Sequence, residues 1–296
     1  MKTSNHLLRR LTAALLAAVL ALSIALPVFA SDDGDTIYIN SVSDLLSLAR
    51  SCAYDQWSVG KTVILQKDLS LEGMLWEPIP SFSGQFKGNG HTISDLTITG
   101  QYSPAGLFGI VEEQGSIESL SVRGIVSVSD SADTTTGGIV GINHGTLINC
   151  QFTGVVTGDS EVGGIVGRNE SEGTIDHSTA RAIVTGKSST GGIAGYNLGA
   201  ITGCTNVGSI NTEYQEASLD TDGFTAKMVD QINNKIAAAD DDAPNSVTNV
   251  ATDTGGIAGR SSGMILTSVN TGTVGYEHIG YNVGGIVVPI HRLPKR

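Results

Sequence analysis

Short runs of β-branched residues, separated by glycine, asparagine and serine-threonine turns, fill most of the chain after about residue 60. These runs show no helical periodicity, so the pattern predicts strands and turns. A glycine box, Gly-Gly-Ile-Val-Gly or Gly-Gly-Ile-Ala-Gly, recurs at residues 137–141, 163–167, 191–195 and 255–259. Variants stand at 105–109 and 284–287, and successive starts are 32, 26, 28, 64 and 29 residues apart. The chain is therefore a repeat, with one long interval.

A second string follows the glycine boxes, including the variant at 105–109, with apolar or small residues in four columns. The first column predicts an inward row of Ile117, Leu147, Ile175, Ile201 and Ile265. The next three columns are Leu120, Cys150, Ser178, Cys204 and Ser268, then Gly124, Gly154, Ala182, Gly208 and Gly272, then Val126, Val156, Val184, Ile210 and Val274. Four columns in register through five copies identify a genuine structural repeat.

One such unit cannot bury its apolar face alone, but stacked units place each Ile or Val above its equivalent, about 4.8 Å away. We therefore predict an all-β parallel β-helix, a β-solenoid that winds right-handed by the usual crossover rule. A β-propeller is the runner-up. Its blades need about 40 residues, so the shorter period favours the solenoid. The box glycines suit tight corners where a larger side chain would clash: Gly106, Gly109, Gly138, Gly141, Gly164, Gly167, Gly192, Gly195, Gly256 and Gly259.

The ends of a solenoid expose strand edges and therefore need caps. Residues 31–60 predict a short strand at Thr36 to Ile39 and a capping helix between Ser41 and Ala53, with Ser41 or Ser43 as N-cap. The coils are expected over residues 61–288. Residues 289–296 match nothing earlier, and we expect an irregular tail that is either natural or the mark of a truncation.

The long interval contains an insertion of about residues 213–250. Phe224, Met228, Val229, Ile232 and Ile236 form an apolar stripe at helical spacing. We expect a helix laid against the solenoid wall, followed by an acidic loop. A lateral binding element or a calcium site is the alternative, although three consecutive aspartates lack the alternate-residue spacing of calcium loops.

The first thirty residues have the layout of a secretory signal peptide, with a basic start, an apolar run over residues 11–26 and Pro27. Cleavage is expected between Ala30 and Ser31, and an uncleaved anchor is the alternative. Removing residues 1–30 leaves 14 basic against 29 acidic side chains. This balance opposes nucleic acid as a partner. No second apolar stretch is long enough to span a membrane, so we expect a secreted or cell-surface protein.

Three cysteines, Cys52, Cys150 and Cys204, make a disulfide framework implausible by their odd number. Cys150 and Cys204 are equivalent positions two coils apart, beyond disulfide reach, so we expect free buried thiols. Asn143, Asn169 and Asn197 share another position, with Ser261 in the next copy. We expect turn residues or an asparagine ladder, and a carbohydrate or calcium site is the alternative.

The sequence supplies no catalytic, metal-ligating or cofactor-binding residues that we could nominate. The histidines have no HExxH spacing, and no serine stands in a nucleophile elbow. The outward positions Glu118, Ile148, Asp176, Thr202 and Leu266 form no line of carboxylates of the kind that polysaccharide-cleaving solenoids use.

The glycine boxes at 137–141, 163–167, 191–195 and 255–259, with the lead-in at 76–93, resemble the GLUG motif, a repeat of bacterial surface and secreted proteins. The motif also occurs in the non-catalytic part of IgA-specific metallopeptidase precursors. The resemblance covers most of residues 60–288 and implies architecture and a surface setting. It brings no catalytic residues.

The leading functional hypothesis is a non-enzymatic extracellular β-solenoid, an adhesin-like binding or scaffold module whose partner is an unknown glycan or protein. The alternatives are a polysaccharide-active β-helix enzyme and a passive spacer within a larger, truncated surface protein.

Overall fold

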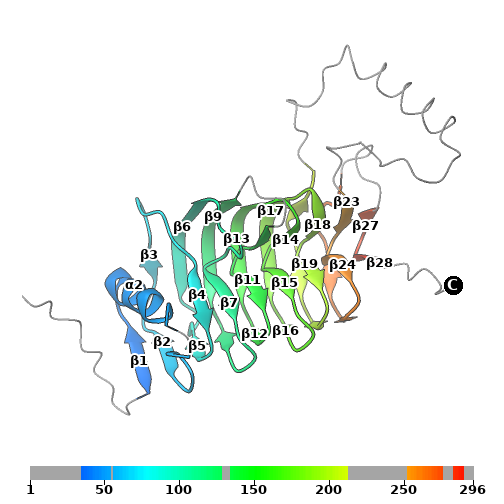
Figure 1. The fold of residues 1–296 in the computed structure, drawn as a ribbon. Coiled ribbons are helices and arrows are strands. Elements are labelled where there is room, and N and C mark those ends of the chain that lie inside the picture. The colour runs from blue at the N-terminus through cyan, green and yellow to red at the C-terminus, as the bar shows by residue number, and fades with distance from the viewer. Residues whose placement is uncertain (1–34, 55, 129–133, 213–251, 276–282, 290–296) are drawn as a thin grey trace, which may run out of the picture.

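The computed structural model describes residues 35–54, 56–128, 134–212, 252–275 and 283–289. Within these residues the chain winds into a parallel β-solenoid with a single short helix at the N-terminal end (Figure 1). The predicted fold class is confirmed. The predicted signal peptide with its cleavage site at Ala30 and Ser31, the helical insertion and the tail beyond residue 289 lie outside the described residues.

Four parallel sheets, A to D, run along the solenoid; the first coils contain strands of sheets C, A and B, and from β10 onward the order in a coil is D, C, A, B. Sheet A contains β1 (Thr36–Ile39), β2 (Thr62–Leu65), β5 (Gln85–Lys87), β8 (Ser116–Glu118), β12 (Thr146–Ile148), β16 (Thr174–Asp176), β20 (Ala200–Thr202) and β25 (Met264–Leu266). Sheet B contains β3 (Leu69–Ser70), β6 (Thr92–Gly100), β9 (Ser121–Val128), β13 (Gln151–Thr157), β17 (Thr179–Thr185), β21 (Thr205–Asn206), β22 (Ser209–Ile210) and β26 (Val269–Asn270).

Sheets C and D are joined by the glycine box. Sheet C contains β4 (Ile79–Phe82), β7 (Phe108–Val111), β11 (Val140–Asn143), β15 (Val166–Asn169), β19 (Ala194–Asn197), β24 (Ala258–Ser261) and β28 (Val287–Pro289). Sheet D contains β10 (Thr135–Gly137), β14 (Glu161–Gly163), β18 (Ser188–Gly191), β23 (Thr252–Gly255) and β27 (Val283–Gly284).

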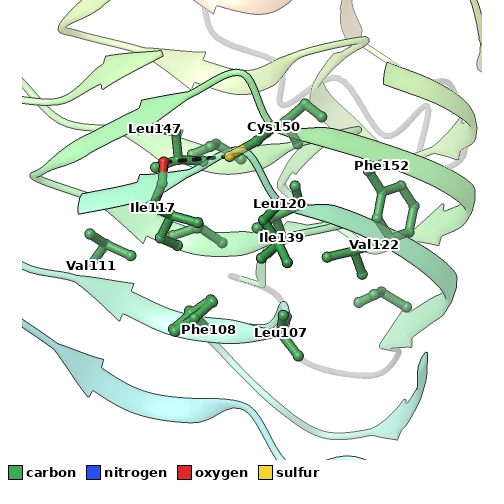
Figure 2. Packing of buried hydrophobic residues seen from close by; sticks show 14 of the residues in the cluster. Leu107, Phe108, Val111, Ile117, Leu120, Val122, Ile139, Leu147, Cys150 and Phe152 are labelled. Atoms are coloured by element: carbon green, nitrogen blue, oxygen red, sulfur yellow. Dashed lines mark hydrogen bonds between the residues drawn. The ribbon is translucent and has the colours of Figure 1, made fainter. Parts of the chain in front are cut away.

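The columns predicted from the repeat are the rungs of the structure. Leu147 pairs with Ile117 on one side and Ile175 on the other, and the row continues through Ile201 to Ile265. The first four of these side chains are fully buried, while Ile265 in the last coil is partly exposed. Figure 2 shows part of this interior, where Ile117, Leu147 and their neighbours stack between the sheets. The register derived from sequence is therefore confirmed.

Both predicted glycine columns lie where neighbouring coils come closest. A Cβ added to Gly138, Gly164, Gly192 or Gly256 would reach the carbonyl oxygen of the equivalent glycine in the following coil at less than 3.0 Å, a distance that real Cβ atoms essentially never show. The other column faces the preceding coil, and Cβ atoms there would meet backbone at Gly141, Gly167, Gly195 and Gly259. The first copy of the box is less tightly packed. A Cβ added to Gly106 would lie 2.9 Å from the Ile139 carbonyl oxygen, and one added to Gly109 would lie 3.1 Å from the Pro80 carbonyl oxygen.

The N-terminal end is closed by helix α2 (Val42–Ser51), which begins at the predicted N-cap Ser41. The Ser41 hydroxyl accepts a hydrogen bond from the Asp44 amide at 3.2 Å. Leu45 and Leu48 are fully buried beneath the helix, so its apolar face covers the end of the core. Strand β1 already pairs with β2. The expected strand at Thr36 to Ile39 is therefore the first strand of sheet A.

The interior changes along the axis from large to small side chains. Phe82, Phe86 and Phe108 pack together near the N-terminal end, with ring centroids 5.4–6.3 Å apart. In sheet B the inward column runs from Val122 and Phe152 through Ala180 to Asn206 and Asn270. Large apolar volume is therefore concentrated in the first coils.

The described C-terminal end is more open. Strands β25, β26, β27 and β28 are the last described members of their sheets, and β28 extends to Pro289. Large apolar side chains of these last coils are exposed: Met264, Leu266, Val269, Val283 and Ile286. Within the described residues, no helix has the length and hydropathy needed to cross a membrane.

A charge placed in the inward row should unfold the stack locally. Ile201→Asp buries a carboxylate at a fully buried position, at a cost well above the ~1.5–3 kcal/mol of lost apolar burial. The neighbouring Thr202 points outward, and Thr202→Asp should change the free energy of unfolding by less than about 0.5 kcal/mol. Urea denaturation of both variants tests this. Equal effects would contradict the register.

A matched pair of glycines tests the close approach of coils. Gly256 and Gly285 occupy the same box position in successive coils, yet a Cβ would clash with backbone only at Gly256, because nothing lies within 4 Å of one at Gly285. Gly256→Ala should lower the free energy of unfolding by about 1–3 kcal/mol or more. Gly285→Ala should be nearly silent. The measurement is the thermal or urea midpoint of the two variants, and a silent Gly256→Ala would refute the packing argument.

Candidate binding surface

The outer side of sheet B is the broadest regular surface of the solenoid. Its strands β6, β9, β13 and β17 are seven to nine residues long, whereas those of sheet A are three or four. In-register pairing repeats each outward position from coil to coil. We use the name "sheet B face" for the outward residues of β9, β13 and β17: Ser121, Arg123, Ile125, Ser127, Gln151, Thr153, Val155, Thr157, Thr179, Arg181, Ile183 and Thr185.

An aliphatic column runs along the middle of the sheet B face. Val155 pairs with Ile125 in the preceding coil and with Ile183 in the following one. Ile125 is 47% exposed and Ile183 is 38% exposed. Isolated exposed aliphatic residues are ordinary, but three in register on successive coils form a continuous apolar strip. Sequence reasoning missed this strip because it did not assign the residues between the inward columns.

Two arginines flank the strip on one side. Arg123 and Arg181 share a column with Thr153 between them, and both are exposed. No ion pair involves either guanidinium within the described part of the chain. Strands β9, β13 and β17 contain no acidic residue. In a chain of net charge −12, the sheet B face is therefore locally basic.

The corner between sheets D and C bears ion pairs instead. Arg168 contacts Glu161 at 2.6 Å and Glu170 at 2.7 Å, and its guanidinium lies 5.1 Å from the centroid of the Tyr196 ring. Burial raises the pKa of the Glu161 carboxyl, and the charge of Arg168 partly offsets this. These contacts occupy most of the Arg168 guanidinium, so little of it is available to bind a ligand.

The same pairing recurs two coils later, between Arg260 and the buried Asp253. In both cases the acid stands seven residues before the arginine, with the glycine box between them. The sequence signal is therefore an acidic residue, six residues that include Gly-Gly-Ile, and an arginine. It was missed because seven residues span a corner that only the folded coil brings together.

The predicted asparagine column is an interior ladder. Asn143 Nδ2 donates to Asn169 Oδ1 at 2.8 Å, and Asn169 Nδ2 donates to Asn197 Oδ1 at 2.8 Å. Asn197 Nδ2 then donates to Ser261 Oγ at 3.0 Å. All three asparagines are fully buried and also donate to corner carbonyls, such as that of Gly145. The ladder interpretation is confirmed, and these amides face the interior, away from the sheet B face.

The ladder begins with an unpaired group. Asn143 Oδ1 is buried without a hydrogen-bond donor, because the equivalent residue in the preceding coil is Val111. A second ladder, from Asn206 Nδ2 to Asn270 Oδ1 at 2.7 Å, lies on the inner side of sheet B. We did not predict it, although the shared Asn-x-Gly pattern at 206–208 and 270–272 signals it.

The cysteines are free and buried, as expected. Cys150 Sγ contacts the Ile117 carbonyl oxygen at 3.5 Å and that of Ile148 at 3.4 Å, and Figure 2 shows the thiol inside the core. Burial raises the pKa of Cys52 and of Cys150 to about 12 and that of Cys204 to about 11. Thiolate chemistry is thereby suppressed.

One surface depression of about 650 Å³ lies at the turns between sheets C and A, among Ser81, Glu112, Glu113, Gln114 and His144. The Ser81 hydroxyl in this depression already donates to Glu112 Oε1 at 2.7 Å. Among the described residues, no three His, Cys, Asp or Glu side chains gather as metal ligands would. Sheet A shows the expected outward row from Glu118 to Leu266, which mixes acidic, polar and apolar side chains.

A family model supports the class of repeat that this architecture defines. Residues 158–185 match the model of the GLUG motif. The match covers the turn after β13, then β14, β15, β16 and β17, which make up one complete coil. The chain is thus a parallel β-solenoid that carries a GLUG motif, as the glycine boxes suggested.

Two curated proteins are similar over part of the chain. "Halomucin" of Haloquadratum walsbyi is 32% identical over 155 residues, which are 48% of this chain and 2% of that protein. A "Putative Gly-rich membrane protein" of Evansella cellulosilytica is 29% identical over 137 residues, 33% of this chain and 16% of that protein. The chain therefore spans only a small fraction of the relatives that it matches.

A solved structure titled "putative immunoglobulin A1 protease" from Bacteroides ovatus aligns with 61% of this chain and 69% of its own. The two are 16% identical, with a TM-score of 0.42.

The buried thiols should make stability fall in alkali. Unfolded thiols ionise near pH 8.5, whereas the folded protein retains their protons up to about pH 11–12. The unfolded state is therefore favoured increasingly above about pH 8.5, by up to about 1.4 kcal/mol per pH unit and thiol. Urea denaturation at about pH 7.5 and 9.5 measures this loss.

Cys150→Ser provides the control, since Ser178 and Ser268 occupy the same column. Its loss between the two pH values should be smaller than that of the wild type by about 1.4 kcal/mol. Identical losses would show that the thiol ionises in the folded protein. Native protein should also react with a thiol reagent at pH 8 far more slowly than protein in urea.

Proposed function

We propose that this protein is a non-enzymatic extracellular or cell-surface β-solenoid that presents the sheet B face to a partner, as an adhesin-like or scaffold module. The observation that carries the proposal is the in-register strip Ile125, Val155 and Ile183 beside two arginines that form no ion pair with any described residue. These side chains point away from the core, so packing of the core does not account for them. Binding is the use that fits it.

The setting is inferred from independent features. The first thirty residues have a signal-peptide pattern, and one relative is named as a membrane protein. The GLUG motif at 158–185 is consistent with surface and secreted proteins. Buried free thiols with raised pKa values are also protected from oxidation outside the cell.

A binding screen tests the proposal. Secreted full-length protein is applied to arrays of extracellular glycans and proteins, and hits are repeated with Ile125→Ser/Ile183→Ser. The double variant removes two of the three aliphatic side chains of the strip and leaves the core intact, so at least one specific ligand should lose affinity about tenfold or more. The control is Ile110→Ser/Ile142→Ser, which changes outward aliphatic residues of sheet C.

Three results would contradict the proposal: no specific ligand, as for a passive spacer; ligands insensitive to the sheet B variant; or glycan cleavage by the purified protein. Polysaccharide turnover that is lost on substituting a surface carboxylate would support the enzyme alternative instead.

A further inference from the structure

We infer that the ligand of the sheet B face is an acidic polysaccharide, lying along the solenoid axis across β9, β13 and β17. The inference rests on the proposed function and names the chemical class of its partner. It follows from three properties of the face: the strands that form it, the charge that it carries, and the spacing of its columns.

The face is made by interior strands. Strand β13 is paired along its full length with β9 and β17, so its backbone N–H and C=O groups are already used. A peptide strand binds a sheet through the free backbone groups of an edge, and none are offered here. Recognition must therefore come from side chains, which suits a polymer that presents hydroxyls and acidic groups along both sides.

The charge of the face selects an anion. Arg123 and Arg181 are two coils apart, about 9.6 Å at the usual strand spacing. A guanidinium can bind a carboxylate or sulfate through two parallel hydrogen bonds. Because the chain as a whole is acidic, an anionic polymer is repelled by most of its surface. Such a ligand is therefore directed toward the arginine column.

The other columns match the remaining chemistry of a sugar polymer. Ile125, Val155 and Ile183 form an apolar strip that can cover the C–H face of sugar rings. On its far side from the arginines lies the hydroxyl column of Ser127, Thr157 and Thr185. Each of these three coils thus repeats an apolar position beside a hydroxyl, and Arg123 and Arg181 add a charge to the first and third of them.

Acidic residues border the sheet B face. Asp95 stands on β6, in the coil that precedes β9, and accepts hydrogen bonds from Ser70 and Ser94. Asp68 lies at the same end, where its pKa is lowered chiefly by the Thr92 amide, with a minor contribution from Arg123. Glu118 and Asp176 stand on the adjoining sheet A. Repulsion from these carboxylates confines an anionic chain to the strands between them.

The test uses the full chain and three polymers of similar length: polygalacturonate, neutral dextran and poly-L-glutamate. Affinity is measured by calorimetry at low salt and at about 0.15 M salt. The expected result is binding of polygalacturonate that weakens with salt, with at least about tenfold weaker binding of the other two.

The decisive variant is Arg123→Ser/Arg181→Ser, which should lower the affinity for polygalacturonate about tenfold or more. The control variant is Arg50→Ser/Lys87→Ser, which also removes two positive charges, one from helix α2 and one from sheet A. It should leave the affinity for polygalacturonate unchanged. Both double variants should keep the wild-type thermal midpoint, because all four side chains lie outside the core.

Four results would overturn the inference: no binding of polygalacturonate, equal binding of dextran, equal binding of poly-L-glutamate, or equal losses in the two double variants. The proposed function is judged separately. A neutral glycan or a protein that binds through Ile125 and Ile183 would preserve the binding face and reject only the acidic ligand.

Discussion

The close approach of neighbouring coils at the glycine box is the constraint on which the rest of the structure depends. Interstrand hydrogen bonds set the distance between coils, and at this distance Gly164 and Gly167 leave no room for a Cβ on either side. A larger residue would separate two coils there and tilt one against the other. Every inward column and every ladder requires coils that stay in register, so each depends on this corner.

Register then determines what can be buried. An asparagine inside a protein core is costly unless each polar group finds a partner. Here each Asn amide donates to its equivalent one coil further on, so the cost falls mainly on the first member, Asn143, whose Oδ1 has no donor. The same register keeps Cys150 and Cys204 apart and protonated. The interior thus tolerates polar and small side chains, after first coils that contain the large phenylalanines.

The register also orders the outer surface. Equivalent residues of successive coils lie above one another and form columns on the surface. Neighbouring columns together form a face whose residues repeat from coil to coil along the solenoid axis. At the corner of sheets D and C, these columns bring acids and arginines into contact, as in Glu161 and Arg168. On sheet B they place Arg123 and Arg181 beside an aliphatic strip, on strands that contain no acidic residue. The two surfaces therefore differ in how their charges are arranged although they share one repeat: at the first the arginine is paired with acids, and on the second the arginines are exposed.

The sequence by itself determined the repeat, the inward row through Ile201, the asparagine column and the helix that begins at Ser41, because these follow from local pattern and period. The tertiary structure decided what depends on contacts across corners: the 161–168 ion pair, the second ladder at Asn206, and the start of sheet A at Thr36. It also decided the left-handed corner at Ser119, Asn149, His177, Gly203 and Thr267, where Ser119 and Thr267 are not residues that favour positive φ. The physical reason is that the stacked coil imposes this backbone conformation, whereas single-residue preference does not.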